Sequence, residues 1–233
     1  MSSKKEEQRK VKEVKQASSK RQEQLTGWLL KGGAGVLVLL VAIVFYQGLF
    51  LVPQSPPPGQ VAVADHVRGN TDAAHTLTVY ADFQCPACMT ETNLIARAWP
   101  QIGERTKLVF RHYPLDTHRH SFIAARYAEA AARQDAFWPM HDILYANQAV
   151  WSGVEEATGM FDSYATDLGL DVMQLKLDVE LPEVREKILG DQRGGTRAGV
   201  RSTPTLFIDG RQVLRNPGSV SEMVSLLANA SKE

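Results

Sequence analysis

The sequence predicts an α/β domain that carries an inserted block of helices and is preceded by one N-terminal transmembrane helix. Three observations support this fold class. Residues 32–52 form a run of 21 residues without a charged side chain. The remainder alternates strand-like and helix-like segments in an order typical of α/β domains. Cys85 and Cys88 lie three residues apart, where the first of these strands gives way to a helix.

Residues 1–31 form a basic head. They contain nine Lys or Arg and four Glu, a net charge of +5, whereas the rest of the chain has 17 basic and 22 acidic residues, a net charge of −5. The whole chain is therefore neutral, and its charge predicts no nucleic-acid partner. The contrast between a basic head and an acidic body needs an explanation, which the next segment supplies.

Residues 32–52 are predicted to cross a lipid bilayer. A helix of this length extends about 31 Å, the thickness of the bilayer hydrocarbon. Trp28 and Lys31 suit the headgroup region at one end. Because basic residues are concentrated before this run, the positive-inside rule places the head in the cytoplasm and the body outside the cell membrane. A buried core helix is the alternative, but this run is longer and more uniformly apolar than most core helices.

A cleaved signal peptide is a second interpretation of the N-terminal region. Ala62-Val63-Ala64 has the pattern of a cleavage site. However, a Pro-rich stretch separates it from the apolar run, and that run exceeds the usual length of about 7–15 residues for such a region. An uncleaved anchor is favoured, and either outcome exports the body.

Residues 53–72 are interpreted as a Pro-rich linker and lead-in, and residues 73–233 as the folded domain. Pro86 suits the first turn of a helix, Asp171 is a predicted N-cap, and Asp209-Gly210 is a hairpin turn. The predicted elements are strands 76–83 and 107–113 on either side of helix 86–99, helices 121–133, 136–148, 160–168, 172–179 and 182–189, a hairpin of strands 205–208 and 212–214, and a final helix 220–230.

Cys85 and Cys88 are the only cysteines, so they act as one local pair and a disulfide-stapled scaffold is excluded. Residues three apart at a helix start lie on one helix face. The unpaired N–H groups there favour a negative group, so we expect the pKa of Cys85 to fall below that of a free thiol. A thiolate attacks disulfides. Cys88 is then the resolving thiol.

Two other interpretations of the cysteine pair are weaker. A structural zinc site needs four N or S ligands, and no second CxxC exists. The histidines at 112, 118, 120 and 141 could supply the remaining ligands, but His118-x-His120 lacks the common histidine spacing and the cysteine motif begins directly after a strand. A purely structural disulfide that closes so small a loop removes little chain entropy. We therefore expect no metal and no other cofactor at this pair.

These residues resemble a known family. A strand, then Cys85-Pro86-Ala87-Cys88 and a helix, with residues 202–210 (STPTLFIDG) near the C-terminus, look like the thioredoxin fold. The helical insertion and Phe137-Trp138-x-x-His141 look like its DsbA-like branch. The resemblance covers residues 73–232 and implies that Pro204 is a cis-proline beside the redox pair. It also implies that Thr203 binds the backbone of an extended substrate, and that Pro86 and Ala87 tune the pair.

The chain departs from the family pattern in two respects. The buried acid that thioredoxins place six residues before the first cysteine is Val79 here. Asp82 is the alternative candidate for proton transfer, or else a solvated residue at the strand end. The dipeptide between the cysteines lacks the His of strongly oxidising members. His112 is a weaker candidate for the site, whereas His141 is expected at the edge of the core.

The sequence thus predicts a membrane-anchored, extracytoplasmic thiol–disulfide oxidoreductase that forms disulfides in exported proteins. Its expected partners are the thiols of exported proteins or peptides, the lipid bilayer through one helix, and a membrane redox partner that the resemblance suggests is quinone-linked. A disulfide reductase or isomerase of the same fold is the alternative, although the chain has no room for a separate dimerisation domain between stalk and fold. A membrane-tethered peptide-binding chaperone is a further alternative.

Overall fold

The computed structural model describes residues 38–44 and 55–230. Residues 38–44 are helical, and they form part of a unit, residues 1–52, that is separate from the domain at 53–233. The basic head 1–31 and most of the predicted transmembrane segment 32–52 lie outside the described residues. Within the described ranges, no helix has both the length and the apolar character needed to cross a bilayer.

A five-stranded sheet is the centre of the domain, in the order β1-β3-β2-β4-β5. The neighbours β2 and β3 are parallel, with Leu77 opposite Leu108, and all other pairs are antiparallel. Parallel pairing brings the C-terminal ends of β2 and β3 to the same edge of the sheet. The strands are β1 (His66–Arg68), β2 (His75–Ala81), β3 (Thr106–His112), β4 (Thr205–Ile208) and β5 (Arg211–Gln212).

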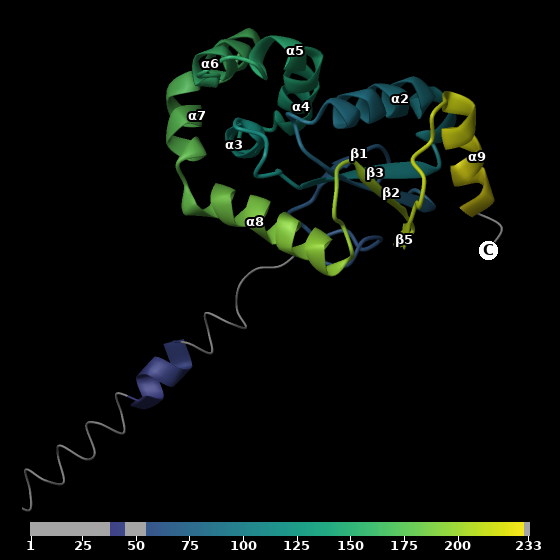
Figure 1. Cartoon of the computed structure of the whole chain (residues 1–233), viewed down its shortest axis with the longest axis horizontal. Coiled ribbons are helices and arrows are strands. Elements are labelled where there is room, and N and C mark those ends of the chain that lie inside the picture. The colour runs from purple at the N-terminus through teal and green to yellow at the C-terminus, as the bar shows by residue number, and fades with distance from the viewer. Residues whose placement is uncertain (1–37, 45–54, 231–233) are drawn as a thin grey trace, which may run out of the picture. The chain divides into compact units, whose positions relative to one another are not determined.

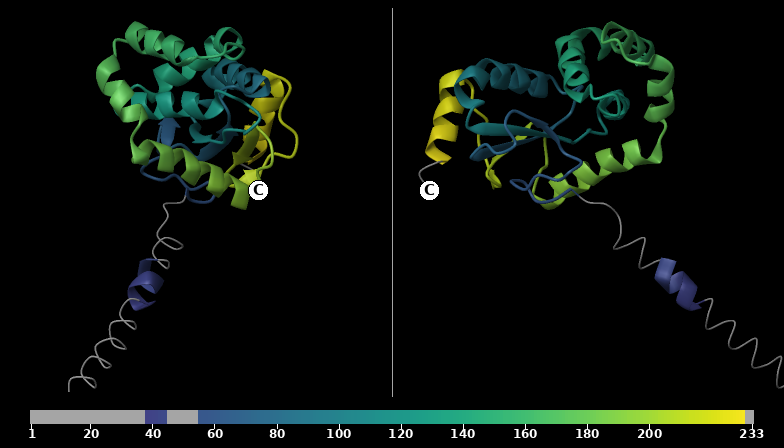
Figure 2. Two further views of the ribbon diagram at one scale, coloured as in Figure 1. Left: turned by 60° about the vertical axis from the view of Figure 1, so that its left-hand side comes forward. Right: turned by 180° about the vertical axis from the view of Figure 1, so that it is seen from behind.

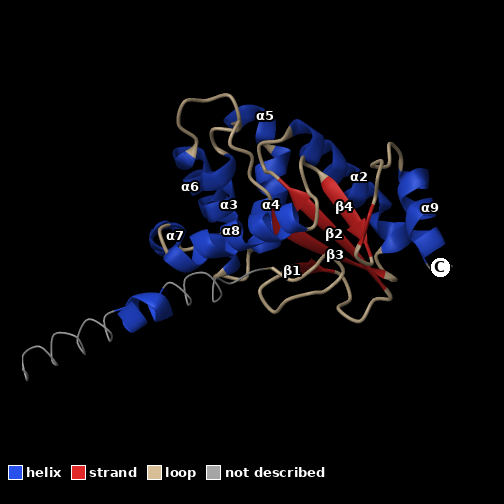
Figure 3. Ribbon diagram, turned by 60° about the horizontal axis from the view of Figure 1, so that its bottom comes forward, coloured by secondary structure: helices blue, strands red, loops and turns tan. Residues whose placement is uncertain are grey.

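Helices cover both faces of the sheet (Figures 1 and 2). Helix α2 lies on one side with α9 against it, and α8 lies on the other side. The insertion between β3 and β4 gathers at one end of the sheet, away from α9 (Figure 3). The helices are α2 (Pro86–Ile102), α3 (Ser121–Ala132), α4 (Phe137–Ala146), α5 (Gln148–Trp151), α6 (Thr158–Asp167), α7 (Val172–Val179), α8 (Pro182–Arg197) and α9 (Val220–Ala230).

The sheet separates two apolar clusters. The larger cluster includes Leu77, Val79 and Phe110 and continues through the helical insertion to the buried Trp151. The smaller cluster contains Tyr80, Tyr113, Val200 and Phe207. Because neighbouring residues of a strand point to opposite faces, Val79 and Tyr80 belong to different clusters. All seven residues of β2 are consequently buried.

The sequence predicts most elements at or near their observed bounds. Strand β4 and helices α7 and α9 are confirmed as predicted. Asp171 caps α7 by accepting a hydrogen bond from the Gln174 N–H at 2.9 Å. Asp209 and Gly210 have positive φ and form the hairpin turn. The helix predicted for 136–148 is instead two helices, α4 and α5, with Asn147 between them.

The prediction that α8 ends near Leu189 is wrong, because the helix continues to Arg197. Glycine lowers helix propensity by about 1 kcal/mol relative to alanine, so Gly190, Gly194 and Gly195 suggest an end. Gly194 and Gly195 instead allow close packing against Ser55 and Tyr80. A Cβ added at Gly195 would lie 2.8 Å from the ring of Tyr80. The sheet therefore requires a glycine at a position where helix propensity disfavours one.

Strand β1 was not predicted, and it lies within residues 53–72, the segment interpreted as linker and lead-in. The residues before it are held by Arg111, which is fully buried. Its guanidinium donates to the backbone oxygens of Pro56 (2.6 Å) and Gln60 (2.7 Å) and pairs with Asp65 at 2.9 Å. Both charged side chains are at most 1% exposed. This buried ion pair fixes residues 56–65 against the sheet.

We predict that Arg111→Met lowers the free energy of unfolding by about 3–5 kcal/mol, because it leaves the Asp65 carboxylate buried without its guanidinium. Methionine keeps much of the side-chain volume, so the loss of stability arises from the missing charge and the missing hydrogen bonds. Chemical denaturation followed by circular dichroism measures it. The control is Arg126→Met, since the Arg126–Glu180 pair is exposed at Glu180 and should change stability by less than about 1 kcal/mol. Equal effects of the two substitutions would contradict the role of Arg111.

Candidate functional site

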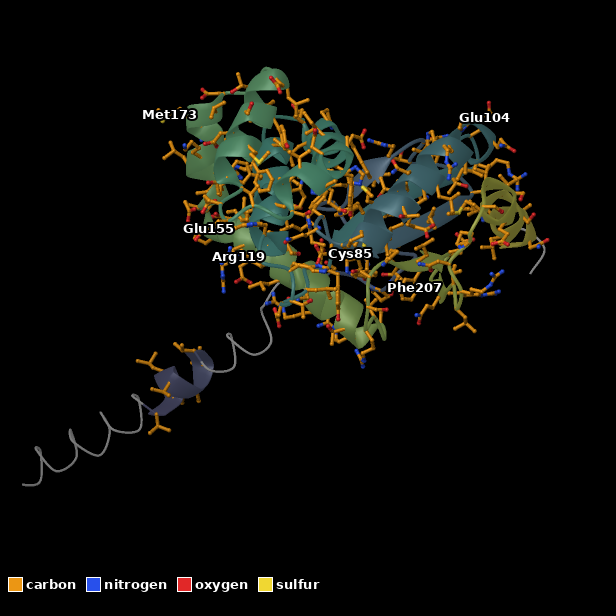
Figure 4. All side chains as sticks on the ribbon, turned by 45° about the horizontal axis from the view of Figure 1, so that its top comes forward. Cys85, Glu104, Arg119, Glu155, Met173 and Phe207 are labelled. Atoms are coloured by element: carbon orange, nitrogen blue, oxygen red, sulfur yellow. The ribbon has the colours of Figure 1, made fainter. Side chains whose placement is uncertain are left out.

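The redox pair lies at the start of α2, just beyond the end of β2. Cys85 is the N-cap residue in an extended conformation, and Pro86 occupies the first helical turn, where its missing N–H costs no hydrogen bond. Both sulfurs are free thiols. In Figure 4, Cys85 lies between the helical insertion and the part of the domain that carries Phe207 on β4. The structure thus places both predicted cysteines on one helix, one turn apart.

Cys85 is held as a thiolate. Its pKa falls to about 5, chiefly because the Cys88 thiol donates a hydrogen bond to the sulfur. Burial opposes this shift, while Thr203 and the backbone N–H groups of Cys88 and Ala87 add to it. These N–H groups belong to the first turn of α2, where the positive end of the helix dipole favours a negative group. Cys85 is therefore ionised at neutral pH and is the nucleophile of the pair.

Cys88 has the opposite character. Its side chain is 1% exposed, and burial raises its pKa far above that of a free thiol, with the neighbouring Cys85 adding to the effect. The backbone N–H of Asp82 points at the Cys88 sulfur at 3.5 Å. A protonated, buried thiol beside an ionised one is the arrangement expected of a resolving cysteine.

The loop before β4 approaches Cys85 from the other side. The Thr203–Pro204 peptide bond is cis, as the resemblance implies. The Cys85 sulfur lies 3.5 Å from the carbonyl oxygen of Thr203, to which it donates only when it is protonated. Thr203 therefore lies where the resemblance places it, next to the sulfur that a substrate would contact.

Asp82 organises the loops around the site. Its buried carboxylate accepts hydrogen bonds from the Gln84 N–H (2.7 Å) and the Leu115 N–H (3.0 Å), and it contacts His118 Nδ1 at 2.7 Å. Leu115 and His118 follow β3, whereas Gln84 follows β2. The alternative of a solvated strand-end residue is wrong, since Asp82 is 1% exposed. Its role in proton transfer stays a prediction.

Sequence reasoning missed several residues that support the pair. Gln148 donates from Nε2 to the carbonyl oxygens of Phe83 (2.7 Å) and Cys85 (2.9 Å). The Tyr145 hydroxyl donates to the Asp82 carbonyl oxygen at 3.3 Å. His118 pairs with the Asp82 carboxylate. These side chains come from the insertion and from the loop after β3, so no short motif links them to the cysteines.

Glu91 is a further missed residue, one turn beyond Cys88. It belongs to the buried face of α2, as Cys88 does, and side chains three apart on a helix are neighbours. Its Oε1 atom is buried without a hydrogen-bond partner among the described residues. Burial alone raises the pKa of Glu91 to about 7. A carboxyl group that exchanges a proton near neutral pH thus lies beside the resolving thiol.

The remaining candidates from the sequence lie in an aromatic cluster behind the site. Phe83 contacts the rings of His112 and His141 at centroid distances of 5.9 and 5.7 Å. His112 and His141 are both buried, so the expectation that His141 lies at the core edge is wrong. Phe137 is a buried core residue, and Trp138 packs on the core from a partly buried position.

A family model described as thioredoxin matches residues 62–229 of the chain. Solved structures share the fold. BdbD from Bacillus subtilis is 19% identical, with a TM-score of 0.65, and the match covers 78% of this chain and 99% of that one. DsbA2 from Pseudomonas aeruginosa is 25% identical, with a TM-score of 0.59, covering 75% of this chain and 98% of that one. The expected thioredoxin fold with a DsbA-like insertion is confirmed.

The chain also matches part of the sequence of several curated proteins. The chain is 38% identical over 149 residues to the Na⁺/H⁺ antiporter NhaA of Herminiimonas arsenicoxydans, a match that covers 64% of this chain. It is 34% identical over 168 residues to the Na⁺/H⁺ antiporter NhaA 1 of Mycolicibacterium gilvum. These matches span only 23% and 26% of the two relatives.

We predict that alkylation of Cys85 by iodoacetamide rises with pH about a midpoint near 5. Cys88→Ala should raise this midpoint by about one to two pH units, because it removes a hydrogen bond to a charged group. Cys88→Ser should raise it less, because a serine hydroxyl still donates. Quenched reactions resolved by mass spectrometry give both profiles. Identical midpoints in the two variants would contradict the hydrogen bond from Cys88.

We predict that Glu91→Gln stabilises the domain at alkaline pH. The folded pKa of about 7 exceeds the ordinary value of 4.5, so the wild type is stabilised by protonation at low pH and loses this as pH rises through 7. The variant has no such loss. Its advantage should be absent below about pH 4.5 and reach about 3 kcal/mol above pH 7. Urea denaturation at several pH values measures it, with exposed Glu104→Gln as the control. A pH-independent difference would contradict the burial of an ionising carboxyl group.

Proposed function

The chain belongs to the thioredoxin family, and we propose that it is a thiol–disulfide oxidoreductase that forms disulfides in exported proteins. The observation that carries the proposal is the unlike pair of sulfurs: Cys85 with a pKa of about 5 and Cys88 with a strongly raised pKa, one helical turn apart. BdbD and DsbA2, whose folds this domain shares, support the reaction class.

The proposed oxidation proceeds in two exchanges. A substrate thiolate attacks Cys85 of the Cys85–Cys88 disulfide, so the sulfur–sulfur bond breaks and Cys88 leaves with the electron pair and takes up a proton. A second thiolate of the same substrate then attacks the substrate sulfur that is bonded to Cys85. The substrate disulfide forms, and Cys85 leaves as a thiolate. The pair has gained the two electrons that the substrate lost.

The stabilised thiolate supports oxidation as the direction of electron flow. A thiol of low pKa is a good leaving group, and its stabilisation favours the reduced pair over the disulfide. Because the folded pKa of Cys85 is depressed to about 5, this stabilisation is fully present above the pKa of an unfolded thiol and is lost as pH falls through 5. The absence of a histidine between the cysteines does not prevent this, since the Cys88 thiol and the backbone N–H groups of Ala87 and Cys88 supply the donors.

We predict a reduction potential for the Cys85/Cys88 couple nearer to about −120 mV than to the value of about −270 mV typical of thioredoxin. Equilibration of the full chain with glutathione buffers measures it. The oxidised protein should convert a reduced substrate protein to its disulfide form, and Cys85→Ser should abolish the conversion. A potential near −270 mV would instead favour the reductase. A function that persists after both cysteines are replaced would favour the peptide-binding chaperone.

We further propose that residues 32–52 anchor the domain in the cell membrane, with the basic head in the cytoplasm and the catalytic domain outside. The uncharged run and the charge contrast around it support this location. The partial relatives are named as Na⁺/H⁺ antiporters, and the match takes up about a quarter of their length. A membrane redox partner, quinone-linked by family resemblance, would reoxidise the pair.

We predict that a reporter enzyme active only outside the cytoplasm is active when fused after Glu233. The chain should also remain with the membrane fraction after washing with high salt and with carbonate, because the apolar run rather than charge holds it there. A fusion to the same reporter after Lys31 is the matched control and should be inactive. Activity of a cytoplasmic reporter at the C-terminus would overturn the orientation.

A further inference from the structure

Three side chains that the redox chemistry does not use converge behind the active-site segment. They are His66 on β1, His112 at the end of β3 and Glu129 on α3. The Nε2 atoms of both histidines lie 2.7 Å from the same carboxylate oxygen, Glu129 Oε1. One donor atom from each residue lies within 4.8 Å of the other two. We call these three residues the His–Glu–His cluster.

Rigid elements hold the His–Glu–His cluster. The side chains of His112 and Glu129 are 1% and 9% exposed, and that of His66 is 15% exposed. The His66 ring stacks on Phe137, and the His112 ring packs against Phe83 and Phe110. Two strands and a helix thus fix the donor atoms, and the partial exposure of His66 leaves a route from solvent.

Glu129 is a buried carboxylate whose side chain is 9% exposed, and its ion-pair partners among the described residues are the two histidines of the cluster. The lysine whose charge it influences, Lys187, is already committed to Asp191 at 2.7 Å and Asp65 at 3.8 Å. The described ion pairs therefore give Glu129 no lysine or arginine partner of its own.

We propose that the His–Glu–His cluster binds one divalent transition-metal ion of the Zn²⁺ class, through Nε2 of each histidine and a carboxylate oxygen of Glu129. Two imidazoles and one carboxylate are a ligand set that zinc accepts, with a fourth position left for water. Ca²⁺ and Mg²⁺ prefer six or more oxygen ligands, so the two imidazole nitrogens select against them. This site does not depend on the cysteines and goes beyond the proposed redox function.

The surroundings of His112 limit the affinity of this site. A histidine that binds a metal ordinarily donates its other ring N–H to an acceptor, which orients the ring. His112 Nδ1 is buried and has no hydrogen-bond partner among the described residues. Loss of such a partner typically weakens metal binding about 10–100-fold. We therefore expect weaker binding than at structural zinc sites with complete surroundings.

The test uses the full chain in detergent with Cys85→Ser and Cys88→Ser, because a free dithiol binds zinc by itself. Titration with Zn²⁺ in competition with a chromogenic chelator should show one bound equivalent. Glu129→Gln and His66→Gln should each lower the affinity for Zn²⁺ by at least about 100-fold. His75→Gln is the matched control: His75 is a histidine in β2 that lies outside the His–Glu–His cluster and pairs with Asp209, and its replacement should leave the affinity unchanged.

Two further readouts separate a metal site from a merely structural cluster. Zn²⁺ should raise the Tm of the parent and of His75→Gln but not that of His66→Gln, whereas Ca²⁺ should raise none of them. If Glu129→Gln fails to fold, His66→Gln decides the question, because its side chain is the most exposed of the three. Binding that survives His66→Gln, binding of less than one equivalent, or a preference for Ca²⁺ would overturn the proposal.

Discussion

The parallel pairing of β2 and β3 is the constraint on which the site depends. It brings two loops from separate parts of the chain to one edge of the sheet, where the Asp82 carboxylate joins them. The same residue directs its backbone N–H at the Cys88 sulfur. The start of α2 is thereby positioned, and with it the donors that keep Cys85 ionised. The helical insertion supports the same segment, because Gln148 donates hydrogen bonds to the carbonyl oxygens of Phe83 and Cys85.

Two thiols of identical chemistry acquire unlike acidities within one turn of helix. Cys85 meets backbone N–H groups at the positive end of the helix, whereas Cys88 is buried. Each cysteine also increases the pKa shift of the other. The proton retained by Cys88 supplies the strongest hydrogen bond to the Cys85 thiolate, and Cys85 in turn raises the pKa of Cys88. The helix therefore sets the roles of the two sulfurs: the outer sulfur, Cys85, is the one that exchanges with substrate, and the inner sulfur, Cys88, leaves in the first exchange and keeps its proton.

The sequence predicts the local features of this protein well, and the long-range ones poorly. The cysteine pair, the Asp171 cap and the hairpin at 209–210 depend on neighbours along the chain, and the structure has them as predicted. The extent of α8 does not depend on such neighbours, since Gly195 is required by the ring of Tyr80, more than a hundred residues away. Strand β1, the position of Glu91 and the His–Glu–His cluster likewise arise only when distant segments pack together.

The buried guanidinium of Arg111 is among the first groups of the folded domain to resist a force applied to the chain from its N-terminal side. A pull applied along the chain from its N-terminal side reaches the folded domain at Ser55 and Pro56 before it reaches any strand. The Ser55 hydroxyl donates a hydrogen bond to Asp191 on α8. The backbone oxygens of Pro56 and Gln60 accept hydrogen bonds from Arg111 on β3. The load is thus divided between a helix on one face of the sheet and the interior strand β3, and these bonds lie before the short edge strand β1 along the chain.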